Sequence, residues 1–152
     1  MARSIRLLWV MLGAATIMWA ADPAVGTWKL NLAKSKYVPG PAPKSQTRIY
    51  AEAPGGIKAT VTTVNRDGTT FVEEYPANSD GVEHSVTGNP DLDGIIMKKI
   101  DDFTAVSTLI HAGVVLGTAR RTVSADGKTM TITYQGTLSG EKVNNVGVYD
   151  KQ

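Results

Sequence analysis

Apolar and polar residues alternate in short runs along the chain from residue 26 onwards. Trp28, Leu30 and Leu32 occupy every second position of the first run, with polar residues between them. Successive side chains of a strand point to opposite faces, so this period of two predicts strands with one buried face. No stretch after residue 20 keeps a helical period, which predicts an all-β fold.

Turn residues separate these runs, so that the pattern predicts about ten strands. The intervening segments include "NRDG", "NSDG" and "SADGK", and Asp-Gly pairs are the strongest short-range signal for a hairpin. The runs themselves are rich in Thr, Val, Ile and Tyr, which favour strands. The predicted strands are 27–32, 46–53, 57–64, 69–77, 82–88, 95–100, 103–110, 114–123, 129–137 and 143–152.

Short turns join strands that are antiparallel neighbours in a sheet. A long meander of this kind has two free edges unless it closes on itself. We therefore expect a single antiparallel up-and-down β-barrel over residues 22–152, wide enough to leave interior space. A two-sheet sandwich is the alternative, although Greek-key sandwiches use longer crossovers. Pro39, Pro41 and Pro43 interrupt the pattern and predict a surface connection.

The first 21 residues have the pattern of a secretory signal peptide. Arg3 and Arg6 precede an uncharged apolar run at 7–20, and alanines follow. We expect a periplasmic or secreted protein that has no integral membrane segment after cleavage. An uncleaved N-terminal anchor is the alternative.

Charge and cysteine content exclude several classes of partner and chemistry. The chain has 16 Lys and Arg against 14 Asp and Glu, so loss of Arg3 and Arg6 leaves 14 of each. A nucleic-acid partner would require a concentrated basic surface, so none is expected. The chain has 0 cysteines, which excludes disulfides, thiol catalysis and thiolate metal sites.

Gly26-Thr27-Trp28 resembles the G-x-W motif of lipocalins and the wider calycin group. The opening "GTWKL" and the closing "DGKTMTITYQG" and "VYDKQ" are also similar to intracellular fatty-acid-binding proteins, although Gly147 stands where those proteins carry an arginine before Tyr149. The whole chain is similar to small exported bacterial proteins of lipocalin-like type. The resemblance implies a barrel with an internal ligand site. It also implies an arginine of a late strand lying across the Trp28 ring.

The alternation in the late strands assigns candidate residues to the barrel interior. Arg120 and Arg121 must face opposite sides, and we place Arg121 inside because it shares its parity with Gly117 and Ala119. Small residues at such positions favour a cavity. Met130, Ile132 and Tyr134 form the only apolar face of their run, so we expect them inside as well. In the last run Tyr149 competes for the inner face with Val146 and Val148.

No sequence motif predicts an enzyme, a cofactor or a metal site. The chain has no nucleophile elbow, phosphate loop or dinucleotide fingerprint. Glu73 and Glu74 are adjacent, so they face opposite ways and cannot act as an acid–base pair, although one of them can be luminal. His84 is in phase with Val82 and Val86. A luminal histidine could ligate haem, as in nitrobindin-like barrels, but a hydrogen-bonded histidine is the simpler interpretation.

These observations predict an exported, non-catalytic binding protein of the lipid-binding type for a small apolar or amphipathic molecule. We expect such a ligand to lie against the predicted inner residues and to place its polar end at an arginine or tyrosine. The alternative is an interaction or inhibitor module of the cell envelope that uses its loops and has a filled interior. The sequence does not predict the oligomeric state. The candidate ligand-binding residues are Trp28, Arg121, Met130, Ile132, Tyr134 and Tyr149.

Overall fold

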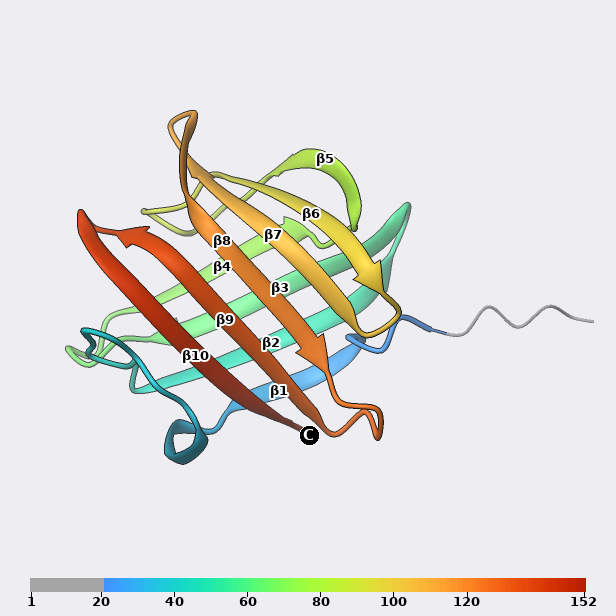
Figure 1. The fold of residues 1–152 in the computed structure, drawn as a ribbon, viewed down its shortest axis with the longest axis horizontal. Coiled ribbons are helices and arrows are strands. Elements are labelled where there is room, and N and C mark those ends of the chain that lie inside the picture. Colours follow the sequence, from blue (N-terminus) through green and yellow to red (C-terminus); the bar gives the residue numbers. More distant parts are fainter. Residues whose placement is uncertain (1–20) are drawn as a thin grey trace, which may run out of the picture.

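Ten antiparallel strands follow one another around a single sheet that curls into a nearly closed barrel (Figure 1). The computed structural model describes residues 21–152, so almost all of the predicted signal peptide at 1–21 lies outside the described residues. The strands are β1 (Gly26–Leu30), β2 (Ser45–Ala53), β3 (Gly56–Val64), β4 (Thr70–Pro76), β5 (Asp80–Ser85), β6 (Gly94–Asp101), β7 (Thr104–His111), β8 (Val114–Val123), β9 (Thr129–Leu138) and β10 (Glu141–Lys151), with one 3-10 helix, η1 (Leu32–Lys34).

The sheet order is β4-β3-β2-β1-β10-β9-β8-β7-β6-β5. Strands that follow one another in sequence therefore pair, except β4 and β5 at the two ends of the order, and β1 also pairs with β10. This confirms the predicted up-and-down barrel, and the sandwich alternative is wrong. The chain forms a barrel because most of its connections are tight turns, which are too short to cross from one sheet to another.

The barrel seam lies between β4 and β5, the two ends of the sheet order. A single bridge joins its two sides, where the Glu74 and Thr87 backbones exchange two hydrogen bonds of 3.0 Å. Gly88 follows with a φ of +78°, and a Cβ atom there would lie 1.9 Å from the Val72 carbonyl oxygen. Only glycine therefore allows the chain to pass this close to β4.

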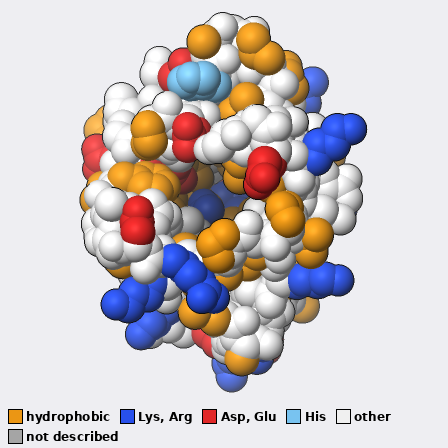
Figure 2. Space-filling model, turned by 90° about the vertical axis from the view of Figure 1, so that its left-hand side faces the viewer, with side chains coloured by type: hydrophobic (Ala, Val, Ile, Leu, Met, Phe, Trp, Pro, Cys, Tyr) orange, Lys and Arg blue, Asp and Glu red, His pale blue; other side chains and the backbone are white. Residues whose placement is uncertain are grey.

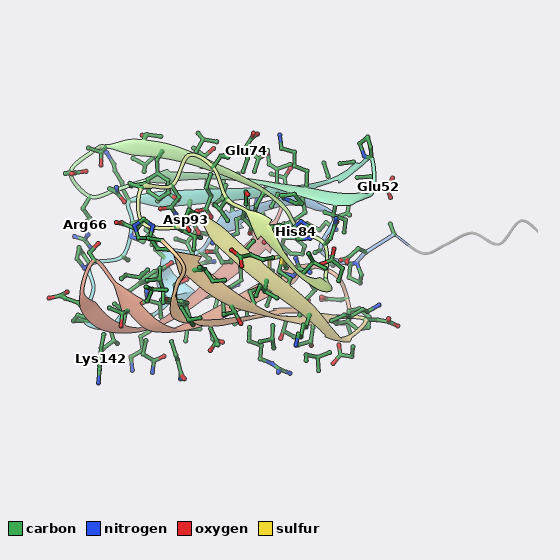
Figure 3. All side chains as sticks on the ribbon, turned by 90° about the horizontal axis from the view of Figure 1, so that it is seen from above. Glu52, Arg66, Glu74, His84, Asp93 and Lys142 are labelled. Atoms are coloured by element: carbon green, nitrogen blue, oxygen red, sulfur yellow. The ribbon has the colours of Figure 1, made fainter. Side chains whose placement is uncertain are left out.

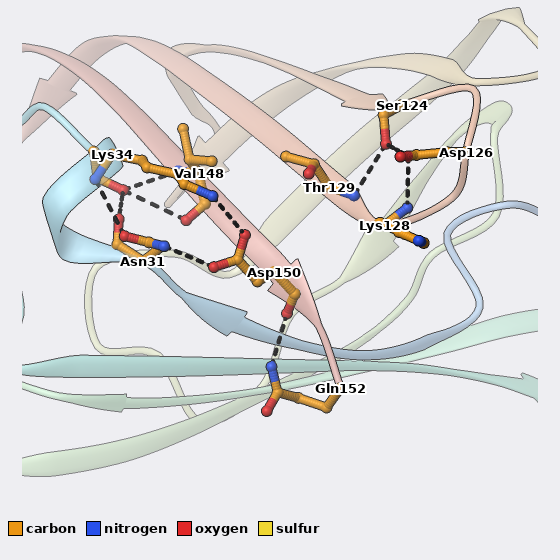
Figure 4. Close-up of polar contacts among 10 residues, drawn as sticks. Asn31, Lys34, Ser124, Asp126, Lys128, Thr129, Val148, Asp150 and Gln152 are labelled. Atoms are coloured by element: carbon orange, nitrogen blue, oxygen red, sulfur yellow. Dashed lines mark hydrogen bonds and ion pairs between the residues drawn. The ribbon is translucent and has the colours of Figure 1, made fainter.

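Aspartate side chains fix several of the turns that the sequence predicted. In the β8–β9 turn, the Asp126 carboxylate accepts a hydrogen bond from the Lys128 backbone N–H at 3.0 Å and one from the Ser124 hydroxyl at 2.6 Å (Figure 4). Ser124 Oγ in turn accepts from the Thr129 N–H at 3.0 Å. These local bonds satisfy the backbone donors of the turn, which is why Asp is favoured there.

The segment between β1 and β2 is held against β10. Asn31 donates to the Asp150 carboxylate at 2.6 Å, and Lys34 forms an ion pair with the same group at 3.2 Å (Figure 4). Lys36 then bridges to Val146 through backbone hydrogen bonds. The segment is a surface connection, as predicted, but it is anchored at several points. Within residues 21–152 no helix is long and apolar enough to cross a bilayer.

Trp28 closes one end of the barrel. Its ring is completely buried, and its indole N–H donates to the Ala24 carbonyl at 2.8 Å. Among residues 21–152, Val61 and Met130 are the other large side chains that are fully buried. The strand that opens the domain thus supplies the floor of the interior, and the space above it is free for other side chains or a ligand.

Candidate ligand-binding cavity

A cavity of about 250 Å³ lies inside the barrel between this floor and the opposite end. Figure 2 looks at that end, the left-hand side of Figure 1, and shows a hollow with Lys or Arg side chains visible in its depth. Residues of eight strands and two connections line it. They are Tyr37, Gln46, Arg48, Tyr50, Thr63, Phe71, Glu73, Tyr75, Asn89, Asp91, Leu92, Ile95, Met97, Ser107, Leu109, Ala119, Arg121, Ile132, Tyr134, Leu138, Asn145, Gly147 and Tyr149.

Tyrosine dominates the lining. The chain has five tyrosines, and each of them contributes to this cavity: Tyr37, Tyr50, Tyr75, Tyr134 and Tyr149. They come from the β1–β2 connection and from β2, β4, β9 and β10, so the ring planes surround the space rather than cover one wall. Such rings provide rigid apolar area with a polar edge.

Arg48 is part of a polar network on β2 and its neighbours. Its Nε donates to Gln46 Oε1 at 3.2 Å, and the Tyr149 hydroxyl donates to the same oxygen. The Gln46 amide then donates to Thr63 Oγ1 at 2.8 Å. The Arg48 guanidinium also lies over the Tyr149 ring, 5.3 Å from its centroid. These contacts fix the Arg48 and Tyr149 side chains at the cavity wall.

Arg121 occupies the wall on β8 and is 92% buried, with 8% of its surface exposed. Its guanidinium lies 5.0 Å from the centroid of the Tyr50 ring. Nε and Nη1 are shielded from solvent, and no acceptor of residues 21–152 is within hydrogen-bonding distance of them. A buried guanidinium with unused donors is costly, because burial removes its hydration without replacing it.

Glu73 is the buried carboxylate of the cavity, with 7% of its surface exposed. Its Oε2 accepts from the Asn89 amide at 2.6 Å. In the described part of the chain, neither Arg48 nor Arg121 forms an ion pair with a carboxylate. The lining therefore holds the buried Arg121 and Glu73 and the half-buried Arg48, and Asp91 is exposed at the rim.

The electrostatic field of the arginines reaches the tyrosines. Burial alone would raise the pKa of Tyr50, but Arg48 and Arg121 outweigh it and lower that pKa below its ordinary value. Burial raises the pKa of Tyr75, and burial together with Tyr149 raises that of Tyr37. The region around Tyr50 thus favours negative charge, whereas the surroundings of Tyr37 and Tyr75 favour the neutral phenol.

Four of the six predicted site residues line the cavity. Arg121, Ile132, Tyr134 and Tyr149 do so, and the inward assignments of Arg121 and Tyr149 agree with their burial at 8% and 2% exposure. Their contact with a ligand stays a prediction.

The other two predicted residues, Trp28 and Met130, lie in the packed floor and outside the lining. Gly117, which was expected to open space, is also outside the lining. It instead lets β8 approach β9 closely, since a Cβ atom there would lie 2.3 Å from the Gln135 carbonyl oxygen. Ala119 does line the cavity.

The expectation that an arginine lies over the Trp28 ring is wrong. Lys151 lies over that ring, 5.1 Å from its centroid, and Arg121 lies over Tyr50 instead. The pairing of strands explains this, because Lys151 of β10 is directly opposite Trp28 of β1, whereas Arg121 is opposite residues of β7 and β9.

His84 does not line the cavity. It lies on β5, as labelled in Figure 3. Its Nε2 lies 2.9 Å from the carboxylate of Asp80 on the same strand. His111 lies 3.5 Å from Asp93 near the open end. Among residues 21–152, no three His, Cys, Asp or Glu side chains are grouped so that they could hold a metal ion.

Several cavity residues were not predicted from the sequence. One face of β2 carries Gln46, Arg48 and Tyr50, and the other carries the apolar Ile49, which is 43% exposed. The more apolar face of β2 therefore points outward, so hydrophobicity does not identify its inner face. Tyr37 follows a lysine-rich connection and reaches the cavity only because that connection folds over β10. No protein-family model matches the chain, and no curated protein is significantly similar to it in sequence.

Proposed function

We propose that this protein is an exported lipocalin-like barrel that binds a small amphipathic molecule in its interior and does not transform it. The observation that supports this most is the cavity of about 250 Å³, which is open at one end and closed by Trp28 at the other. Binding pockets typically combine apolar and aromatic walls with a few placed polar groups. Arg48, Arg121 and Glu73 are such groups here.

The alternative function, an envelope interaction module with a filled interior, receives less support from this cavity. One surface feature favours it. Val114 and Val115, at the start of β8 after the β7–β8 turn, are 62% and 61% exposed. An apolar loop tip of this size can contact a partner. This function predicts that the protein carries no small molecule.

Native mass spectrometry of protein purified from its source tests the proposal. We expect a population whose mass exceeds that of the polypeptide and returns to it on denaturation. Purified, ligand-stripped protein should also bind Nile red, a neutral apolar dye, with saturable fluorescence. A bare polypeptide mass together with no Nile red binding would contradict the proposal and favour the interaction module.

Export is tested separately by N-terminal sequencing of the same protein. We expect the mature chain to begin near residue 22, in the periplasm or outside the cell. An intact Met1 or Ala2 on a cytoplasmic protein would refute export without affecting the binding proposal.

A further inference from the structure

The concentration of every tyrosine of the chain in one cavity points to a flat ligand. Tyr134 donates its hydroxyl to the Thr137 carbonyl at 3.1 Å, and Tyr149 donates to Gln46, so both rings are held in place. Phe71 adds a sixth ring to the lining. Fixed aromatic rings gain stacking and edge-to-face contacts with another aromatic ring that a flexible alkyl chain cannot provide.

The charges of the cavity point to an anion. Arg121 lies over the Tyr50 ring and has buried donors that find no acceptor among residues 21–152. Arg48 lies two residues before Tyr50 on β2, and both line the cavity. Glu73 is bound to Asn89 rather than to either arginine. A carboxylate placed near Tyr50 would supply the acceptors that the Arg121 guanidinium lacks, and a planar guanidinium suits bidentate pairing with a carboxylate.

The size of the space points to a compact molecule. Pockets for drug-sized ligands measure about 300–1,000 Å³. The cavity, at about 250 Å³, is just below that range. A single ring with a short acidic substituent suits this space, whereas a long acyl chain would extend through the open end into water.

We propose that the cavity takes a compact aromatic carboxylate, with its acidic group innermost at Arg121 and Arg48 and its ring between the tyrosines. This inference rests on the proposed binding function and specifies its ligand class. It reverses the arrangement expected of a simple amphiphile site, in which the charged end stays at the mouth in water.

Calorimetric titration of the wild-type mature protein with three probes tests the class. Cinnamate is a compact aromatic carboxylate, cinnamyl alcohol lacks only its charge, and nonanoate keeps the charge without the ring. We expect cinnamate to bind at least about 30-fold more tightly than cinnamyl alcohol, which is ~2 kcal/mol at 1.4 kcal/mol per tenfold. Nonanoate should also bind more weakly than cinnamate.

Two neighbouring arginines provide a matched pair of variants. Arg121→Met removes the buried guanidinium, and Arg120→Met removes the exposed one beside it. We expect R121M to lose about 30-fold or more in cinnamate affinity and to bind cinnamyl alcohol as the wild type does. R120M should bind both probes unchanged. Far-UV circular dichroism confirms that each variant is folded, and the comparison of probes on the wild type stands even if R121M is not.

Each outcome bears on the inference. Equal affinity for cinnamate and cinnamyl alcohol, tighter binding of nonanoate, or equal losses in R121M and R120M would overturn it. If Nile red binds but cinnamate does not, the ligand class is wrong and the binding function stands. If neither binds, both proposals fail.

Discussion

Replacing Trp28 by alanine should remove a large part of the stability of the barrel. The Trp28 side chain is completely buried in the floor, donates to the Ala24 carbonyl at 2.8 Å and lies under the Lys151 ammonium. The variant W28A leaves a void at the closed end and a carbonyl without its donor. Because β1 pairs with both β2 and β10, the lost packing should weaken the contacts among these three strands.

Burial sets the magnitude. Truncation of a buried tryptophan to alanine costs about 3–5 kcal/mol. The lost indole hydrogen bond, worth about 1 kcal/mol, is contained in that range. Domains of this kind have about 5–15 kcal/mol of total stability, so W28A should lose at least about a fifth of it. Trp28→Phe keeps most of the ring and should cost less than half as much.

Urea unfolding followed by far-UV circular dichroism measures the effect. Fluorescence is unsuitable, because Trp28 is the only tryptophan after residue 20. Val114→Ala is the matched control, since its side chain is 62% exposed and should change the free energy of unfolding by less than about 0.5 kcal/mol. A loss below about 1.5 kcal/mol for W28A would refute the account of the floor.

Three further predictions concern the seam and the tyrosines. Gly88→Ala should cost about 2 kcal/mol or more and speed hydrogen exchange at the seam, because its Cβ would collide with the Val72 carbonyl; unchanged exchange and stability would contradict this. Burial raises the pKa of Tyr37 above the ordinary value of 10.0, so the folded protein loses stability as the pH rises above 10.0. Tyr37→Phe cannot ionise and should therefore reduce this loss in urea titrations at a series of pH values. Tyr50 should ionise at a pH below that of an ordinary tyrosine in an ultraviolet titration, and Arg121→Met should raise the pKa of Tyr50; an unchanged Tyr50 pKa in that variant would contradict the effect assigned to Arg121.

The strands were predictable because two independent local signals agree along the chain. Alternation marks the strands, and Asp-Gly turns mark their ends. Asp126, for example, bonds its own turn without help from distant residues. Closure followed from the shortness of the turns, since a long meander otherwise leaves two free edges.

The inner wall was less predictable, because its residues do not share one chemical character. On β9 the inner face is apolar and the outer face is threonine, so Met130, Ile132 and Tyr134 could be placed correctly. On β2 the inner face carries Arg48 and Tyr50, and apolarity gives no guide.

Which residue lies over the Trp28 ring depends on which strand pairs with β1 and in which register. That is set by the pairing of β1 with β10 and not by any local pattern. Tyr37 likewise depends on the fold of a connection that contacts β10 through Lys36 and Val146.

Blocking the cavity tests the central claim most directly. Ala119 lines the cavity between Ser107 and Tyr134, and its neighbour Thr118 is exposed on the outside. The variant Ala119→Phe should abolish saturable Nile red binding and keep its free energy of unfolding within about 1 kcal/mol of the wild type, because a hollow accepts the ring that a packed core would resist at about 1–3 kcal/mol. Thr118→Phe should bind the dye unchanged. Wild-type dye affinity in A119F, or equal loss in both variants, would show that the ligand site is not the interior of the barrel.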